Sequence, residues 1–417
     1  MTTTPAPQPS PETAPRTLHP LRVRDFRLLW MGAAVSLFGD QFYLVAMPWL
    51  VLQLTGSGLA LGTVMMAAAI PRAVFMLMGG VVTDRFSPRR IMMTTACARA
   101  LLVGIVGLLA YRNVIHLWQL YVLSVAFGLA DAFVVPAHSA LIPSIVTPEQ
   151  LPAANSMIQG VVQASTIAGP APAGLVVKRW GIAQAFFIDA VSFLFIIAAL
   201  WRLPEKPRTS SGAQPAPQQN MRRSILEGLE YVWRDPPIRA LMLLSTAVNF
   251  FIAGPLTIGI ATLAKTRMGS ATAFGTMLTV MSVGTLAGLV LAGVVPRPRR
   301  LGTALLVLTA VLGSAMSALG FLQQLLPVAG VLAGMGFASG FVQVHLVSWF
   351  QKRVDRALLG RVMSVLMFGA VGLIPVSYAA AGALVEVSPA AMFLTSGVLV
   401  LGVAAVTGIA GWLKPIE

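Results

Sequence analysis

The sequence contains very little charge. Only 10% of its 417 residues are Asp, Glu, Lys or Arg, whereas about 25% of the residues in a soluble domain are charged. Hydrophobic residues make up 57% of the chain, and the mean hydropathy is +0.81. This composition excludes a soluble globular protein and indicates an integral membrane protein.

Cysteine and histidine are also scarce. The single cysteine, Cys97, lies inside an apolar run, which excludes an internal disulfide and any metal cluster built from several cysteines. The sequence shows no cluster of histidines, no paired metal-binding acids and no nucleophile constellation, so we expect no metal and no cofactor. A membrane-embedded enzyme is therefore the least favoured class of function.

No apolar segment occurs in the first nineteen residues, which are rich in Pro, Thr and Ala. This composition predicts a disordered tail over residues 1–20 and not a signal peptide.

Twelve long apolar runs follow the tail, each long enough for a helix to cross ~30 Å of hydrocarbon. They lie at about 27–52, 59–82, 91–110, 117–136, 154–177, 182–201, 238–262, 273–295, 301–320, 325–349, 361–384 and 390–413. The longest polar segment divides them six and six. We predict an all-α membrane protein of twelve transmembrane helices, with one six-helix bundle at 21–201, a cytoplasmic linker at 202–237 and a second bundle at 238–417.

The distribution of Lys and Arg predicts the orientation. If the N-terminus lies inside the cell, most of the 29 Lys and Arg residues fall in cytoplasmic segments, as the positive-inside rule requires. Both termini are therefore expected to be cytoplasmic. The same distribution argues against nucleic-acid binding despite the net charge of +15, because the charge is spread over short loops beside the spans.

A charged motif follows the second run in the stretch GGVVTDRFSPRR, residues 79–90. It resembles the signature of the major facilitator superfamily, which has a Gly, three intervening residues, then Asp-Arg, and shortly after a pair of basic residues. The matching residues here are Gly80, Asp84, Arg85, Arg89 and Arg90. Ser87 and Pro88 depart from the family pattern, in which a Gly and a base are usual.

The resemblance implies a role for the motif. In the family, the aspartate caps the N-terminus of the eleventh helix, here near Gly360 and Arg361, and helps to hold the cytoplasmic side closed. A carboxylate at a helix N-terminus is favoured by about 0.3 to 1 kcal/mol. The corresponding loop of the second half, residues 293–300, has no aspartate, so we expect Asp84 to act in a conformational latch.

Two further resemblances narrow the subgroup. Gly169, Pro170 and Gly174 in the fifth run resemble a helix-kink element of proton-coupled exporters, with Ala173 in place of one glycine. Such residues permit a kink and the close approach of neighbouring helices. Stretches such as FGDQFYLVAMPWLVLQLTGS and EGLEYVWRDPPIRALM resemble the branch of bacterial facilitators that includes macrolide efflux pumps and enterobactin exporters.

Ionisable residues inside the runs are the candidates for handling protons, because a charge in hydrocarbon is costly without a partner or a cavity. At ~1.5 Å per residue, Asp40 and Arg72 share one level, and Asp131 and Arg99 share another. Asp40, Arg72 and Asp131 are our candidates for proton or substrate handling. For Asp40 the alternative is a structural pair with Arg72.

Three other positions qualify this prediction. Asp189 lies near the outer end of a run that the facilitator fold places at the periphery, so we expect it to be structural. Ser124 stands where many proton antiporters have an arginine before a glycine. His345 could titrate near neutral pH, but a lone histidine is usually a hydrogen-bonded core residue.

Uncharged residues of the runs that line the central cavity in this fold complete the candidate site. The first candidates are Gln41, Tyr43, Met47, Gln163, Asn249 and Phe250, and the weaker ones are Phe42, Trp49, Gln159, Phe251 and Gln343. A mostly apolar wall with few polar groups suits a bulky amphipathic compound. Core packing would explain most of these residues equally well.

Together these features predict a secondary active transporter that exports hydrophobic or amphipathic small molecules, such as a drug, a macrolide or a siderophore, by proton exchange. A uniporter, importer or flippase of a metabolite or lysolipid is the alternative. We expect a monomer in the bacterial cytoplasmic (inner) membrane, whose partners are the substrate, protons and the bilayer.

Overall fold

The computed structural model describes residues 19–204, 221–296, 298, 300–355 and 358–413. For residues 77–81, 83–85 and 221–225 it describes the course of the helix but not the side chains. The described residues form helices and their connections. In hydrocarbon this is expected, because a helix satisfies its backbone hydrogen bonds within its own segment.

The first half of the chain contains eight α-helices and two short 3₁₀ turns. They are η1 (Pro20–Arg22), α1 (Arg24–Thr55), α2 (Gly58–Arg85), α3 (Pro88–Tyr111), α4 (Leu117–Asp131), α5 (Val134–Ile145), η2 (Pro148–Gln150), α6 (Leu151–Ala168), α7 (Pro170–Trp180) and α8 (Ile182–Arg202). We call the part from α1 to α8 the N half.

The second half begins with α9 and continues with seven further helices. They are α9 (Met221–Arg234), α10 (Pro236–Met268), α11 (Ala271–Val294), α12 (Leu301–Leu319), α13 (Leu325–Arg353), α14 (Leu359–Val371), α15 (Ile374–Val387) and α16 (Pro389–Ile409). We call the part from α10 to α16 the C half.

Short polar and glycine signals set the turns between the spans. Gly56 ends α1 in the left-handed conformation with φ of 67°, and Ser57 then caps α2 by accepting a hydrogen bond from the Ala60 amide at 3.1 Å. The same order recurs after α10, where Gly269 has φ of 58° and Ser270 caps α11.

The count of spans agrees with the sequence prediction. Among the described residues, eleven helical segments are long and apolar enough to cross a bilayer, or twelve if α6 and α7, bent by 41° at their junction, form one span. The fourth and eleventh spans each consist of two helices, α4 with α5 and α14 with α15. The predicted domain boundaries stay a prediction.

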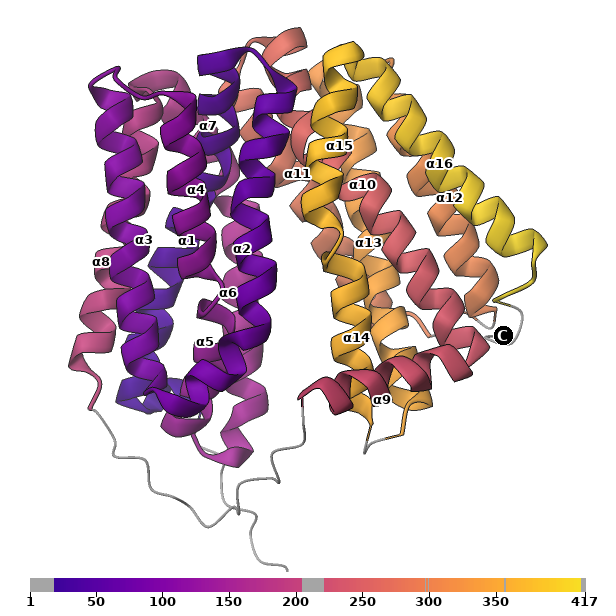
Figure 1. Ribbon diagram of the computed structural model, residues 1–417, viewed down its shortest axis with the longest axis horizontal. Coiled ribbons are helices and arrows are strands. Elements are labelled where there is room, and N and C mark those ends of the chain that lie inside the picture. Colours follow the sequence, from indigo (N-terminus) through magenta and orange to yellow (C-terminus); the bar gives the residue numbers. More distant parts are fainter. Residues whose placement is uncertain (1–18, 205–220, 297, 299, 356–357, 414–417) are drawn as a thin grey trace, which may run out of the picture.

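The two halves meet at one end and diverge at the other (Figure 1). At the end where they meet, α15 packs along α2 and α11 packs along α7. Glycines make this approach possible: a Cβ atom on Gly62 would lie 2.3 Å from the Tyr378 carbonyl oxygen. Glu386 of α15 also accepts hydrogen bonds from the Ser57 hydroxyl at 2.5 Å and the Leu59 amide at 3.0 Å.

The linker contains a helix that the sequence pattern did not predict. Helix α9 lies across the diverging end of the C half (Figure 1) and packs on α10 and α14. Glu227 of α9 forms an ion pair with Arg361 of α14, and Gly228 lies against the Arg361 backbone. At fourteen residues, α9 is too short and too polar to be recognised as a span.

Candidate functional site

Four ionisable residues from four helices form a connected cluster in the N half. Arg99 of α3 lies 2.7 Å from Asp40 of α1 and 3.6 Å from Asp131 of α4. Asp131 also lies 3.1 Å from the Nε atom of Arg72 of α2. We call Asp40, Arg72, Arg99 and Asp131 the charge cluster. Arg99 is at its centre, because it contacts both carboxylates.

Burial and aromatic rings fix the position of Arg99. Its side chain is only 11% exposed, and its guanidinium lies 4.6 Å from the centre of the Phe193 ring and 5.1 Å from that of Phe127. Such cation–π contacts contribute about 0.5 to 2 kcal/mol. Tyr43 stacks on Phe127 with ring centres 4.5 Å apart, which extends this aromatic layer to α1.

The structure corrects one predicted pair and reproduces another. The alternative in which Asp40 forms a structural pair with Arg72 is not found, because Asp40 is bonded to Arg99 while Arg72 contacts Asp131. The expected approach of Asp131 to Arg99 is found. Counting residues along each span predicts the depth of each ionisable residue in the membrane. It does not predict the direction in which the side chain points around the helix axis.

The predicted kink lies between α6 and α7 and is bridged by the opposite half. Thr279 of α11 accepts a hydrogen bond from the Ala171 amide at 3.2 Å and donates one to the Ile167 carbonyl at 3.0 Å. In an uninterrupted helix these two backbone groups would bond to each other. The Thr279 hydroxyl therefore takes the place of one helical hydrogen bond and joins the two halves.

Thr279→Val is expected to loosen this junction. The substitution keeps the shape of the side chain but removes both hydrogen bonds, each worth about 0.5 to 1.5 kcal/mol. Amide exchange at Ala171 should accelerate roughly tenfold, as measured by hydrogen exchange and mass spectrometry. Thr276→Val is the matched control, because the Thr276 hydroxyl bonds only to Thr272 of its own helix. Equal exchange in the two variants would contradict the bridging role.

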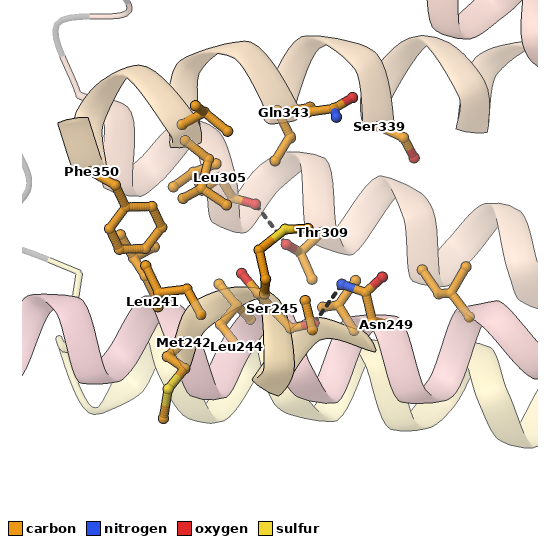
Figure 2. A pocket seen from close by; sticks show the side chains of 18 of the residues that line it. Leu241, Met242, Leu244, Ser245, Asn249, Leu305, Thr309, Ser339, Gln343 and Phe350 are labelled. Atoms are coloured by element: carbon orange, nitrogen blue, oxygen red, sulfur yellow. Dashed lines mark hydrogen bonds between the residues drawn. The ribbon is translucent and has the colours of Figure 1, made fainter. Parts of the chain in front are cut away.

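A cavity of about 410 Å³ lies within the C half, between α10, α12, α13 and α14. Leucine, isoleucine, valine, methionine and phenylalanine side chains supply most of its wall. Figure 2 shows the polar residues of the wall, which are Ser245, Asn249, Thr309, Ser339 and Gln343. The volume lies within the range of small-molecule sites, about 300 to 1,000 Å³.

The polar groups of this cavity are partly engaged by the backbone. The Asn249 amide donates to the Ser245 carbonyl at 2.9 Å, and the Thr309 hydroxyl donates to the Leu305 carbonyl at 2.8 Å (Figure 2). Such local bonds lower the polarity that the wall presents. The cavity therefore offers an apolar surface with few directional groups.

Of the six first candidates for the central cavity, Asn249 also lines this C-half cavity. The place of all six in the central cavity stays a prediction. Phe250, the next residue, packs edge-on against Phe251 with ring centres 5.2 Å apart. Gln343, one of the weaker candidates, also lines the cavity. Gln163 instead links the halves, because its amide donates to the Ser282 carbonyl at 3.3 Å.

The candidates on α1 serve packing in this conformation. Gln41 lies against Gly169 at the α6–α7 junction, where a Cβ atom on that glycine would be 2.4 Å from the Gln41 Cγ atom. Met47 is 1% exposed and belongs to the core. Tyr43 belongs to the aromatic layer around Arg99. His345 is also a core residue: it bonds to the Phe341 carbonyl at 3.1 Å and stacks on the Phe341 ring.

The sequence of the chain matches the Major Facilitator Superfamily over residues 29–377. The chain belongs to the Major Facilitator Superfamily. It is therefore a multi-pass membrane transporter of this superfamily, and the alternative of a membrane-embedded enzyme is excluded.

Two groups of bacterial relatives have names that refer to efflux. The chain is 29% identical over 391 residues to the multidrug efflux pump Tap of Mycolicibacterium fortuitum. The aligned residues cover 91% of this chain and 94% of the relative. It is 26% identical over 227 residues to macrolide efflux protein A of Streptococcus pyogenes, covering 54% of this chain and 55% of the relative.

Solved structures share the facilitator fold. A variant of the nucleoside transporter NupG superimposes with a TM-score of 0.75 at 12% identity, covering 93% of this chain and 98% of that one. A bacterial homologue of the iron transporter ferroportin, solved in the inward-facing state, gives a TM-score of 0.70 at 17% identity, with 94% and 98% covered. At these identities the likeness concerns the fold alone.

The superfamily motif between α2 and α3 is only partly visible. The side chains of Asp84 and Arg85 and the surroundings of Gly80 lie outside what the structure describes, so the latch assigned to Asp84 stays a prediction. Arg89 donates to the last carbonyls of α8, with 2.7 Å to Leu200 and 3.0 Å to Trp201. This arginine therefore ties the start of α3 to the end of α8.

The sequence analysis named Arg99 and Asp189 but did not count them among the candidates for proton or substrate handling, and both come from spans that the superfamily fold places at the periphery. Arg99 on α3 is the centre of the charge cluster, and Asp189 on α8 is completely buried beside it. Asp189 interacts electrostatically with both Asp40 and Arg99. The signal in the sequence was a single acid, Asp189, in an otherwise apolar span. Because the superfamily fold places this span at the periphery, a structural role was favoured for the acid.

Proposed function

We propose that this transporter exports hydrophobic or amphipathic small molecules from the bacterial cytoplasm in exchange for protons. The names of its relatives, multidrug efflux pump and macrolide efflux protein, support the direction and the class of substrate. The apolar wall of the C-half cavity supports the same class, because it offers contact area with few hydrogen-bonding requirements.

The observation that carries the coupling part of the proposal is the Asp40–Arg99 pair. The Asp40 side chain is 24% exposed, so a proton can reach it, yet it lies 2.7 Å from an arginine that is almost buried. Protonation of Asp40 removes the negative charge of its ion pair with Arg99, while the ion pair of Arg99 with Asp131 remains. Such a change in partners can bias one conformation of the two halves over another.

We further propose that both termini and the diverging end of the two halves face the cytoplasm of the inner membrane. The Lys and Arg residues of the loops favour this orientation, and α9 lies at the same end (Figure 1). In this orientation the protein is open inward. We take the monomer to be the transporting unit, because one chain contains both the charge cluster and the cavity.

Transport in proteoliposomes tests the coupling. With an imposed pH gradient, the wild type should accumulate erythromycin and ethidium faster than without one. Asp40→Asn should move both compounds at the rate seen without a gradient, because it holds no exchangeable proton at this position. Glu230→Gln, which alters an exposed ion pair on α9, is the control. Wild-type transport that ignores the gradient would support the uniporter alternative instead.

Filling the C-half cavity tests the substrate site. Ser245→Phe places a phenyl ring in a space of about 410 Å³, and overpacking costs about 1 to 3 kcal/mol. Erythromycin affinity should fall roughly ten- to hundredfold, while the smaller ethidium is affected less. Val398→Phe, on the exposed face of α16, is the matched control. If both variants export erythromycin equally well, the cavity is not the binding site.

A further inference from the structure

Asp189 of α8 is a buried acid with an incomplete set of partners. The residue is 0% exposed, and its Oδ2 atom has no hydrogen-bond partner among the residues that the structure describes. Its Oδ1 atom receives only a long hydrogen bond, 3.4 Å, from the Ser192 hydroxyl. A buried carboxylate without compensating donors is costly, whereas a protonated carboxyl group is much less so.

The position of Asp189 links it to the charge cluster. A Cβ atom on Gly39 of α1 would lie 3.0 Å from Asp189 Oδ1 and 2.0 Å from Ser192 Oγ. The acid therefore lies against the α1 backbone beside Asp40, with which it interacts electrostatically. The absence of a side chain at Gly39 is what allows this contact.

The charges around Asp189 do not balance. Asp40 faces it from α1 and Arg99 from α3, and the cluster extends through Asp131 to Arg72. Tyr43 of α1 also lies nearby, and α7, which packs on α8, has Lys178 and Arg179 only in its last turn. Three carboxylates thus face two arginines. One proton makes the whole group neutral.

We propose that Asp189 is the acid on which the cluster stores one exchangeable proton. Asp40 is bonded to Arg99, and Asp131 contacts both arginines, so Asp189 is the least compensated of the three. A proton enters at the partly exposed Asp40. It then passes to Asp189, which becomes neutral while Asp40 returns to its charged form and pairs with Arg99.

This inference rests on the proposed proton coupling and adds to it the residue, Asp189, on which the proton is held. In the reverse step Asp189 gives up its proton and attracts Arg99, so that the Asp40–Arg99 bond weakens. Arg99 is thus shared between the partly exposed carboxylate of Asp40 and the fully buried one of Asp189. The peripheral helix α8, through Asp189, then takes part in coupling.

Infrared difference spectroscopy of the protein in lipid nanodiscs tests the assignment. At neutral pH the wild type should show the carbonyl band of a protonated carboxylic acid in an apolar site. Asp189→Asn should lose this band, whereas Asp40→Asn and Glu230→Gln should keep it. A band that survives in Asp189→Asn, or that is absent from the wild type, overturns the proposal.

A second variant tests the same assignment if Asp189→Asn does not fold. Ser192→Ala keeps the acid and removes the hydroxyl beside Oδ1, so the frequency of the band should shift if the band belongs to Asp189. An unchanged frequency contradicts the assignment even if Asp189→Asn cannot be purified.

Ethidium transport by the same preparations separates this inference from the proposed function. In one outcome, wild-type transport follows an imposed pH gradient but the infrared carbonyl band persists in Asp189→Asn. This result overturns only the assignment of the proton to Asp189. Wild-type transport that ignores the gradient overturns proton coupling, and loss of the band in Asp189→Asn would still establish Asp189 as a protonated site. If Asp189→Asn loses both the gradient-driven transport and the carbonyl band, the result supports the proposed proton coupling and the assignment of the proton to Asp189.

Discussion

Replacing Arg99 with leucine is expected to destabilise the N half strongly and to abolish export. Arg99 contacts Asp40 at 2.7 Å and Asp131 at 3.6 Å, so its loss leaves Asp40 without its arginine partner and Asp131 with Arg72 alone. Removing one partner of a buried ion pair costs about 3 to 5 kcal/mol. The loss also empties the space between the Phe127 and Phe193 rings. Size-exclusion chromatography after heating measures the change.

Arg72→Leu is the matched control for this prediction. The Arg72 side chain is 55% exposed and contacts only Asp131 within the cluster, so solvent screens much of its interaction and the loss should be smaller. The double variant Arg99→Leu with Asp40→Asn should recover part of the stability, because it removes one of the unpaired charges. Equal stability of the two single arginine variants would show that Arg99 is not the centre of the cluster.

Gly174→Val is expected to prevent the two halves from closing at the end where they meet. A Cβ atom on Gly174 would lie 2.3 Å from the Ala271 carbonyl oxygen of α11, and a backbone atom cannot move aside without displacing its helix. The clash should separate α7 from α11 and stop alternating access. Electron spin resonance between labels at the adjoining ends of these helices, in a Cys97→Ser background, should report a longer distance.

Gly160→Val provides the control for steric bulk. Gly160 lies on α6 in the same span, and nothing is found within 4 Å of a Cβ atom placed there. This variant should keep both the wild-type distance and wild-type export of ethidium. An unchanged α7–α11 distance in Gly174→Val would contradict the requirement for a glycine at this contact.

The sequence predicted the number of spans well, because this number depends on length and hydropathy, which vary little along a span. Length and hydropathy predict twelve crossings, which agree with the eleven to twelve candidate spans among the described residues. Helix α9 was not predicted, since its stability comes from packing on α10 and α14 and from the Glu227–Arg361 pair. The contacts with α14 join residues far apart in the sequence.

The composition of the site was harder to predict than the fold. Depth along a span can be counted, and it correctly brought Asp131 near Arg99. Rotation about the helix axis cannot be counted in this way, and it decides that Asp40 contacts Arg99 and not Arg72. The same uncertainty placed Gln41 in the expected cavity, whereas its side chain packs against Gly169.

The charge cluster and the cavity lie in different halves of one chain. A substitution that reshapes the wall formed by α10, α12, α13 and α14 leaves the arginines and carboxylates of α1 to α4 in place. We therefore expect selection under new antibiotics to act on the C half. Descendants with a different drug spectrum would keep the proposed proton-coupling pair, Asp40 and Arg99, unchanged.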